Sequence, residues 1–194
     1  MKLFTRGFLI DIIASCVFVL SMYSVIYNEA FHPTLPHMQG VWTIEVHQRP
    51  LVLGVTGHNF LVLRNALGEE EGELHGLATN PTTNYWKHVG TDSTDILRVW
   101  EFKDSRYGMY GDTFPGEVIA SGTADDMIAL WNKGRSCADR INEKYIPYPP
   151  YGVRLRGTTE NSNSVAYTLA KCMHITIDRM GLLTPGYGRD LLEK

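Results

Sequence analysis

The sequence lacks the signatures of metal-dependent and nucleic-acid-binding proteins. It has no His-Glu-x-x-His motif and no closely spaced cysteines, so neither common pattern of a zinc site is present. Basic residues are few and scattered, with 18 Lys and Arg against 21 Asp and Glu, which argues against a surface that binds nucleic acid. Internal repeats and low-complexity tracts are also missing. We therefore expect no metal, no cofactor and no nucleic-acid partner.

Residues 1–28 are predicted to form a membrane anchor. The run from Phe8 to Tyr27 is about 20 residues long, enough for a helix to span a bilayer, and Asp11 is its only charge. Lys2 and Arg6 precede it, so the positive-inside tendency predicts a cytoplasmic N-terminus. We expect a single-pass inner-membrane protein whose remaining residues lie on the extracytoplasmic side.

Two other interpretations of this segment stay open. A cleaved signal peptide would make the protein secreted, although the apolar run is long for one and no small-x-small cleavage site follows it. The residues that end at Cys16 look like a lipoprotein box, but the chain stays apolar well beyond that cysteine. In each case residues 29–40 are expected to form a spacer and residues 41–194 a single globular domain.

The globular part predicts an α+β domain, in which an antiparallel sheet packs against a few helices. Runs of β-branched and aromatic residues predict strands at 41–46, 58–65, 73–79, 96–102 and 116–120. Residues 51–55 are expected to extend the first strand after a break at Arg49-Pro50. The second and third strands should form a hairpin, since a polar, acidic turn joins them. Thr123 is expected to cap a helix that reaches Tyr145.

Cys137 and Cys172 are the two cysteines of the globular part. They would pair in an oxidising compartment if folding brings their Cα atoms within bridging distance, which the sequence does not establish. Two separate buried thiols are the alternative, with Cys172 in the middle of a helix.

Ser162, His58 and His75 are the candidate catalytic residues. Asn and Ser crowd the start of a predicted late helix, so Ser162 or Ser164 would present a hydroxyl beside the unpaired N–H groups of its first turn. His58 begins an apolar strand, and the hairpin brings His75 within its reach. A hydroxyl beside an imidazole is the minimum for a nucleophile and its base. The structural alternative is a capping serine and two hydrogen-bonded strand histidines.

These residues carry a resemblance to a known family. Gly57-His58-Asn59-Phe60 on a strand, His75 on the next strand and Asn161-Ser162-Asn163-Ser164-Val165 opening a late helix resemble the circularly permuted branch of the papain-like NlpC/P60 superfamily. That branch includes the lecithin:retinol acyltransferase-like proteins, and the resemblance covers roughly residues 41–174. It implies a permuted papain-like fold, with Ser162 in place of the nucleophilic Cys, His58 as base and His75 as third polar residue.

The sequence departs from the family pattern at Ser162, where the family has a cysteine. The departure matters because a hydroxyl needs a stronger base than a thiol. The resemblance implies a membrane-anchored serine hydrolase or acyltransferase that acts on an ester or amide. An acyl lipid and a peptidoglycan-type peptide are the two substrate classes it suggests. The alternatives are a catalytically inactive binding module of the same fold, and a toxin-like effector that acts in the envelope.

Overall fold

The computed structural model describes residues 40–51, 55–103, 114, 116–154 and 156–193. Residues 1–39, which hold the predicted anchor and nearly all of the predicted spacer, lie outside these ranges. Within the described ranges, no helix is long and apolar enough to cross a membrane.

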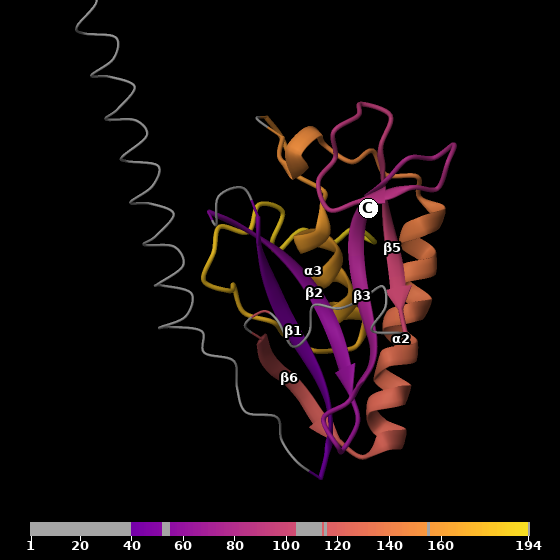
Figure 1. Cartoon of the computed structure of the whole chain (residues 1–194), viewed down its shortest axis with the longest axis vertical. Helices are drawn as coiled ribbons and strands as arrows, with labels where there is room; N and C mark the ends of the chain where they lie inside the picture. The colour runs from indigo at the N-terminus through magenta and orange to yellow at the C-terminus, as the bar shows by residue number, and fades with distance from the viewer. Residues whose placement is uncertain (1–39, 52–54, 104–113, 115, 155, 194) are drawn as a thin grey trace, which may run out of the picture.

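The described residues form an α+β domain, as predicted, with a six-stranded antiparallel sheet and two helices that cover one of its faces (Figure 1). The strands are β1 (Trp42–Leu51), β2 (Thr56–Arg64), β3 (Glu70–Thr79), β4 (Trp86–Lys87), β5 (Ile96–Phe102) and β6 (Gly116–Gly122). The helices are α2 (Ala124–Glu143) and α3 (Ser162–Cys172), and η1 (Pro150–Gly152) is a 3₁₀ turn. The sheet order is β4-β3-β2-β1-β6, with β5 also paired to β3.

Along one edge, β3 changes its pairing partner from β2 to β4. β5 pairs with β3 continuously from Glu73 to Thr79, so β2 and β4 must share the other edge of β3. On that edge, β2 pairs with β3 only as far as Phe60 and His75, and β4 takes over at Ala78. At His58, therefore, β2 is no longer paired with β3.

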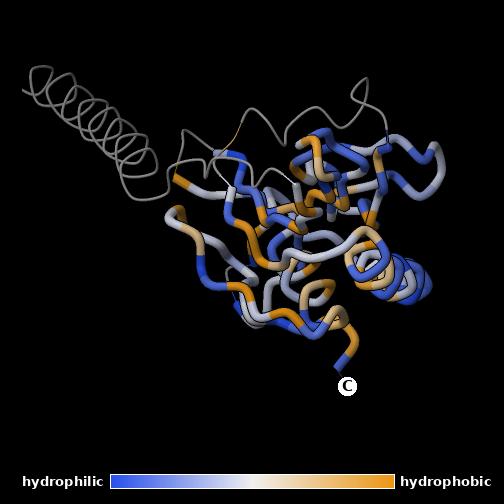
Figure 2. Tube along the Cα trace, turned by 90° about the horizontal axis from the view of Figure 1, so that it is seen from below, coloured by the Kyte–Doolittle hydropathy of each residue, from blue (hydrophilic) through white to orange (hydrophobic). Residues whose placement is uncertain are grey.

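The two faces of the sheet differ in chemistry, because successive strand residues point to opposite sides. The face toward the helices is apolar and packs against both α2 and α3; its strand members include Ile44, Val46, Leu61, Leu63, Leu74, Leu97 and Val99. The opposite face holds buried polar side chains, among them Glu45, His47, His58, Arg64, Glu73 and His75. Figure 2 shows hydrophobic and hydrophilic residues alternating along the chain.

Both helices begin at side-chain caps. Thr123 accepts from the backbone N–H of Asp126 at the start of α2, as predicted. Asn161 and Ser164 form a capping box at the start of α3. A disulfide between Cys137 and Cys172, with Cα atoms 6.5 Å apart, joins the two helices. The alternative of separate thiols is therefore wrong, and Cys172 ends α3 rather than lying in its middle.

The predicted hairpin is confirmed, but the predicted break in the first strand is not. β1 runs through Arg49 and Pro50 without interruption to Leu51. It pairs with β6 only from Trp42 to His47, so Pro50 lies where β1 has become an edge strand. An edge position tolerates the missing N–H of proline, which is why the strand continues.

Candidate functional site

A buried chain of hydrogen bonds links Glu73, His75 and His58. His75 Nε2 lies 2.7 Å from Glu73 Oε2, and His75 Nδ1 lies 3.0 Å from His58 Nε2. All three side chains are almost fully buried. The contact between the two histidines is the one that the hairpin predicts, while their catalytic roles stay predictions.

The acceptors in this chain fix where its protons lie. The Glu73 carboxylate accepts, so His75 carries its proton on Nε2 and offers the lone pair of Nδ1 to His58. His58 then donates from Nε2 and keeps a lone pair on Nδ1. This Nδ1 atom is buried and has no hydrogen-bond partner among the described residues. The chain of hydrogen bonds from Glu73 therefore ends at His58 Nδ1, a nitrogen whose lone pair is unused.

Burial keeps both imidazoles neutral. It lowers the pKa of His58 well below the usual value, and the nearby His75, His88 and Arg49 lower that pKa further. Burial also lowers the pKa of His75, although the hydrogen bond and charge of Glu73 oppose the shift. Neutral His58 can accept a proton, and Glu73 would then stabilise the resulting charge through His75.

Two contacts bring the start of α3 against residues next to the two histidines, although His58 itself does not line the hollow that Ser162 lines. The Asn163 side chain accepts from the backbone N–H of Asn59, the residue after His58, at 3.0 Å. On β3, a Cβ added to Gly76, the residue after His75, would lie 3.0 Å from Ser162 Cα. The start of α3 thus lies beside the point where β2 stops pairing with β3.

The two serines of α3 differ in their hydrogen bonding. Ser164 Oγ lies 3.0 Å from the carbonyl oxygens of both Thr159 and Gly186, which share its single O–H as acceptors, and it accepts from Asn161 N–H, so it has a structural role. The Ser162 hydroxyl, in contrast, makes no hydrogen bond to any described residue, and neither histidine is bonded to it. Gly76 faces α3 whereas the adjacent His75 points to the opposite face of the sheet. Ser162 and His58 therefore lie on opposite faces of the sheet, beyond the last residue pair of β2 and β3.

A small hollow of about 20 Å³ lies at the start of α3. Its walls come from the ends of β1 and β2, the segment after β4, the turn η1 with its flanks, and the cap of α3. Ser162, His88 and Tyr148 are among its lining residues. The volume suffices for about one water molecule.

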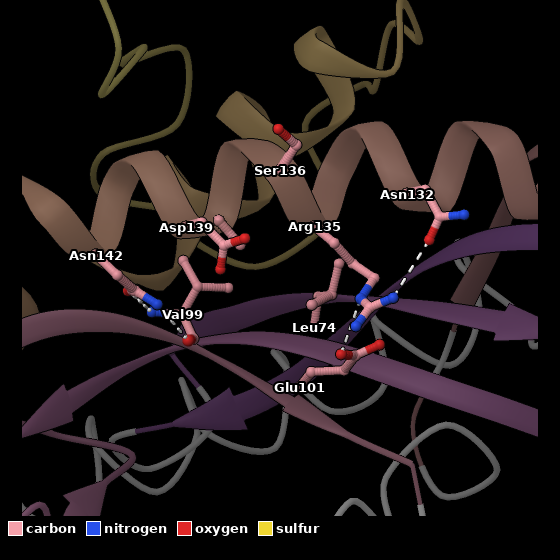
Figure 3. Close-up of a pocket in the computed structure, with 9 residues that line it drawn as sticks. Leu74, Val99, Glu101, Asn132, Arg135, Ser136, Asp139 and Asn142 are labelled. Carbon is pink, nitrogen blue, oxygen red and sulfur yellow. Dashed lines mark hydrogen bonds and ion pairs between the residues drawn. The ribbon is translucent and has the colours of Figure 1, made fainter.

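A larger hollow of about 350 Å³ lies between α2 and β5, away from these residues (Figure 3). Its polar groups are mostly paired with one another. Arg135 Nε lies 3.0 Å from a Glu101 carboxylate oxygen, and the Asn142 side chain bonds both the N–H and the C=O of Val99. Asn142 thereby covers part of the free edge of β5, which is a structural task.

Glu73, His88 and Tyr148 were not anticipated from the sequence. For Glu73 the signal was available, because residues i and i+2 of a strand share a face and Glu73 precedes His75 by two positions. His88 and Tyr148 reach the hollow only through the long-range course of the chain, which no local pattern predicts.

No group of three or more His, Cys, Asp or Glu side chains is placed to hold a metal ion within the described part of the chain. The chain matches no protein-family model and gives no significant match to a curated protein or to a solved structure.

Proposed function

We propose that this protein is a serine hydrolase or acyltransferase that acts on an ester or amide, with Ser162 as nucleophile. The observation that carries the proposal is the buried chain from Glu73 through His75 to His58, which ends in an unused lone pair. Leaving a buried nitrogen without a partner costs free energy that a purely structural chain would avoid. Perturbed, buried titratable groups of this kind concentrate at functional sites.

In the proposed reaction, Ser162 Oγ attacks the acyl carbon while His58 Nδ1 accepts its proton. Glu73 and His75 hold the ring of His58 and stabilise the positive charge that forms on it. The proton then passes to the leaving group, and water or an acceptor alcohol releases the acyl group from Ser162. General-base assistance of this kind contributes about 10²- to 10⁴-fold to a rate.

The order of these residues along the chain supports a permuted papain-like arrangement as part of the proposal. The disulfide supports an oxidising, extracytoplasmic location, because disulfides persist there and are rare in a reducing cytosol. The predicted anchor would hold the domain beside the membrane, where acyl lipids and cell-wall peptides are both within reach.

Covalent labelling tests the proposal. The full-length chain is incubated with a fluorescent fluorophosphonate probe, and labelling is compared among wild type, Ser162→Ala and Ser164→Ala. We expect Ser162→Ala to lose the label and Ser164→Ala, the matched capping-box control, to keep it. Unchanged labelling of Ser162→Ala, or no labelling of the wild type, would refute the nucleophile.

A second candidate function is a catalytically inactive binding module of the same fold. The size of the hollow favours it, since about 20 Å³ admits no acyl substrate unless its walls move. The absence of a hydrogen bond from Ser162 to His58 also fits, although such bonds are often long in ligand-free enzymes. A module of this kind would resist the probe and release no product from p-nitrophenyl butyrate.

A further inference from the structure

The cap of α3 leaves few backbone donors for an oxyanion. The Asn161 side chain accepts from the N–H groups of Asn163 and Ser164, and the Val165 N–H bonds the Asn161 carbonyl oxygen. Only the Ser162 N–H of this first turn has no partner among the described residues. The helix terminus alone therefore supplies one donor to an oxyanion beside Ser162.

An oxyanion formed in acyl transfer is usually held by two or more donors that are fixed in place beforehand. A neutral side-chain hydroxyl can act as such a donor as well as a backbone N–H. The second donor must therefore come from another wall of the hollow.

Tyr148 is the residue placed for this role. It lines the same hollow as Ser162, and its side chain is buried with only 3% exposed. Buried tyrosines usually find a partner for the hydroxyl, yet the Tyr148 hydroxyl makes no hydrogen bond to any described residue. A Cβ added to Gly152 would lie 3.5 Å from this hydroxyl, and the Gly152 carbonyl accepts from the Asn161 side chain at 2.8 Å.

The surroundings hold Tyr148 in a fixed position. Its backbone N–H donates to the Asp95 carbonyl at 2.9 Å. Its ring lies against Gly90, where a Cβ would meet the ring carbon Cδ1 at 2.7 Å, so only glycine leaves room for it. A donor that is fixed before the reaction needs no reorganisation when the charge forms.

We propose that the Tyr148 hydroxyl and the Ser162 N–H together form the oxyanion hole. This inference rests on the proposed function of Ser162. As the Oγ–C bond forms and the Ser162 proton moves to His58, the electron pair of the carbonyl π bond goes to its oxygen. Tyr148 donates a hydrogen bond to that oxygen and keeps its own proton, and the bond weakens again when the carbonyl re-forms.

The ionisation of Tyr148 agrees with a donor role. Burial raises the pKa of its hydroxyl far above the usual value, and the charge of Asp95 raises this pKa further. The phenol therefore stays protonated over the working range of pH and can donate at all times.

Kinetics with matched variants test the inference. Hydrolysis of p-nitrophenyl butyrate by the full-length chain is measured for wild type, Tyr148→Phe, Tyr151→Phe and Ser162→Ala. Tyr151 is the control, because it lines the same hollow but is 72% exposed. We expect Tyr148→Phe to lower kcat by about 10²- to 10³-fold with KM within about twofold, as loss of one oxyanion donor does, and Tyr151→Phe to change little.

The outcomes distinguish the donor role of Tyr148 from the assignment of Ser162 as nucleophile. If Ser162→Ala is inactive while Tyr148→Phe keeps the wild-type kcat, Tyr148 is not a donor but the hydrolase assignment survives. If Ser162→Ala keeps wild-type activity, both fall together. Circular dichroism checks folding, and 3-fluorotyrosine at position 148 provides a second variant that retains the hydroxyl. This variant should keep most of the activity; a loss as large as that of Tyr148→Phe would overturn the donor role.

Discussion

Two carboxylate–imidazole pairs lie on the same face of the sheet, on either side of Phe60. Glu45 and His47 form one pair on β1, and Glu73 and His75 form the other on β3. In both pairs the carboxylate and the ring nitrogen are 2.7 Å apart and are separated by two positions in the sequence. The two pairs differ in what lies beyond the imidazole.

The pair on β1 is closed. His47 Nδ1 lies 2.9 Å from the Phe114 carbonyl oxygen, so both ring nitrogens of His47 face oxygen partners. Glu45 also accepts from Thr43 and Arg64. Burial raises the pKa of Glu45, but the hydrogen bond and charge of His47 and the charge of Arg64 outweigh it and lower that pKa to about 2.

The pair on β3 is open, because it continues to His58 and ends there without a partner. The same Glu-x-His pattern on a strand therefore occurs in two different hydrogen-bonding environments. Charges that are satisfied on all sides stabilise the fold, whereas a chain with an unused lone pair is available for proton transfer.

Replacing one histidine from each region should separate catalysis from structure most strongly. We expect His58→Gln to lower kcat for p-nitrophenyl butyrate by about 10³-fold, because the base is lost. His47→Gln should keep kcat within a few fold, since both ring nitrogens of His47 face oxygen partners and no lone pair is left to accept a proton from Ser162. Equal losses in the two variants would show that the two regions do not differ in function.

Replacing the carboxylates should give the opposite pattern in stability. Glu45→Gln is expected to lower the free energy of unfolding by about 3 kcal/mol, because it removes the buried charge that pairs with Arg64 and His47. Glu73→Gln should cost about 1 kcal/mol, because an amide oxygen can still accept from neutral His75. Urea unfolding followed by circular dichroism measures both values, and a larger loss for Glu73→Gln would contradict the assignment.

The pH dependence of stability should distinguish the two regions further. The pKa values of His58 and His75 are lowered in the folded state, so their contribution is complete above about pH 6.5 and is lost as pH falls below it. Below that pH the free energy of unfolding therefore falls as the pH falls. The contribution of Glu45, with a folded pKa of about 2, is present above pH 4.5 and is lost only below it.

Urea unfolding between pH 5 and pH 7 provides the measurement. His58→Gln should reduce the slope of stability against pH in this range, while Glu45→Gln should leave the slope unchanged. A wild-type stability that does not vary between pH 5 and pH 7 would mean that the two histidines are not buried in the neutral form.

Local sequence patterns predicted much of the fold, because they depend on neighbouring residues. The alternation in β5 and the cap at Thr123 each act within a few positions, so strand and helix could be assigned from them. The path of β1 through Pro50 was missed, because tolerance of proline depends on where β6 stops pairing. The disulfide stayed open for the same reason, since the packing of α2 against α3 decides it.

In the candidate site, too, local patterns could be predicted and long-range contacts could not. The contact of His58 with His75 could be expected, because the hairpin brings the two residues near one another; its register could not, since His75 faces Phe60 and bonds His58 diagonally. The Asn161 cap, which occupies two backbone donors, and the approach of Tyr148 depend on segments that meet only in the folded chain.

The most direct test of the account is the protonation state of His58. Nitrogen-15 NMR of the histidine side chains in the full-length chain, assigned with His58→Gln, reports which ring nitrogen carries a proton. We expect a neutral ring at pH 7, with the proton on Nε2, no proton on Nδ1 and no titration near pH 6.5. A His58 that is protonated on Nδ1, or that titrates with an ordinary pKa, would contradict it.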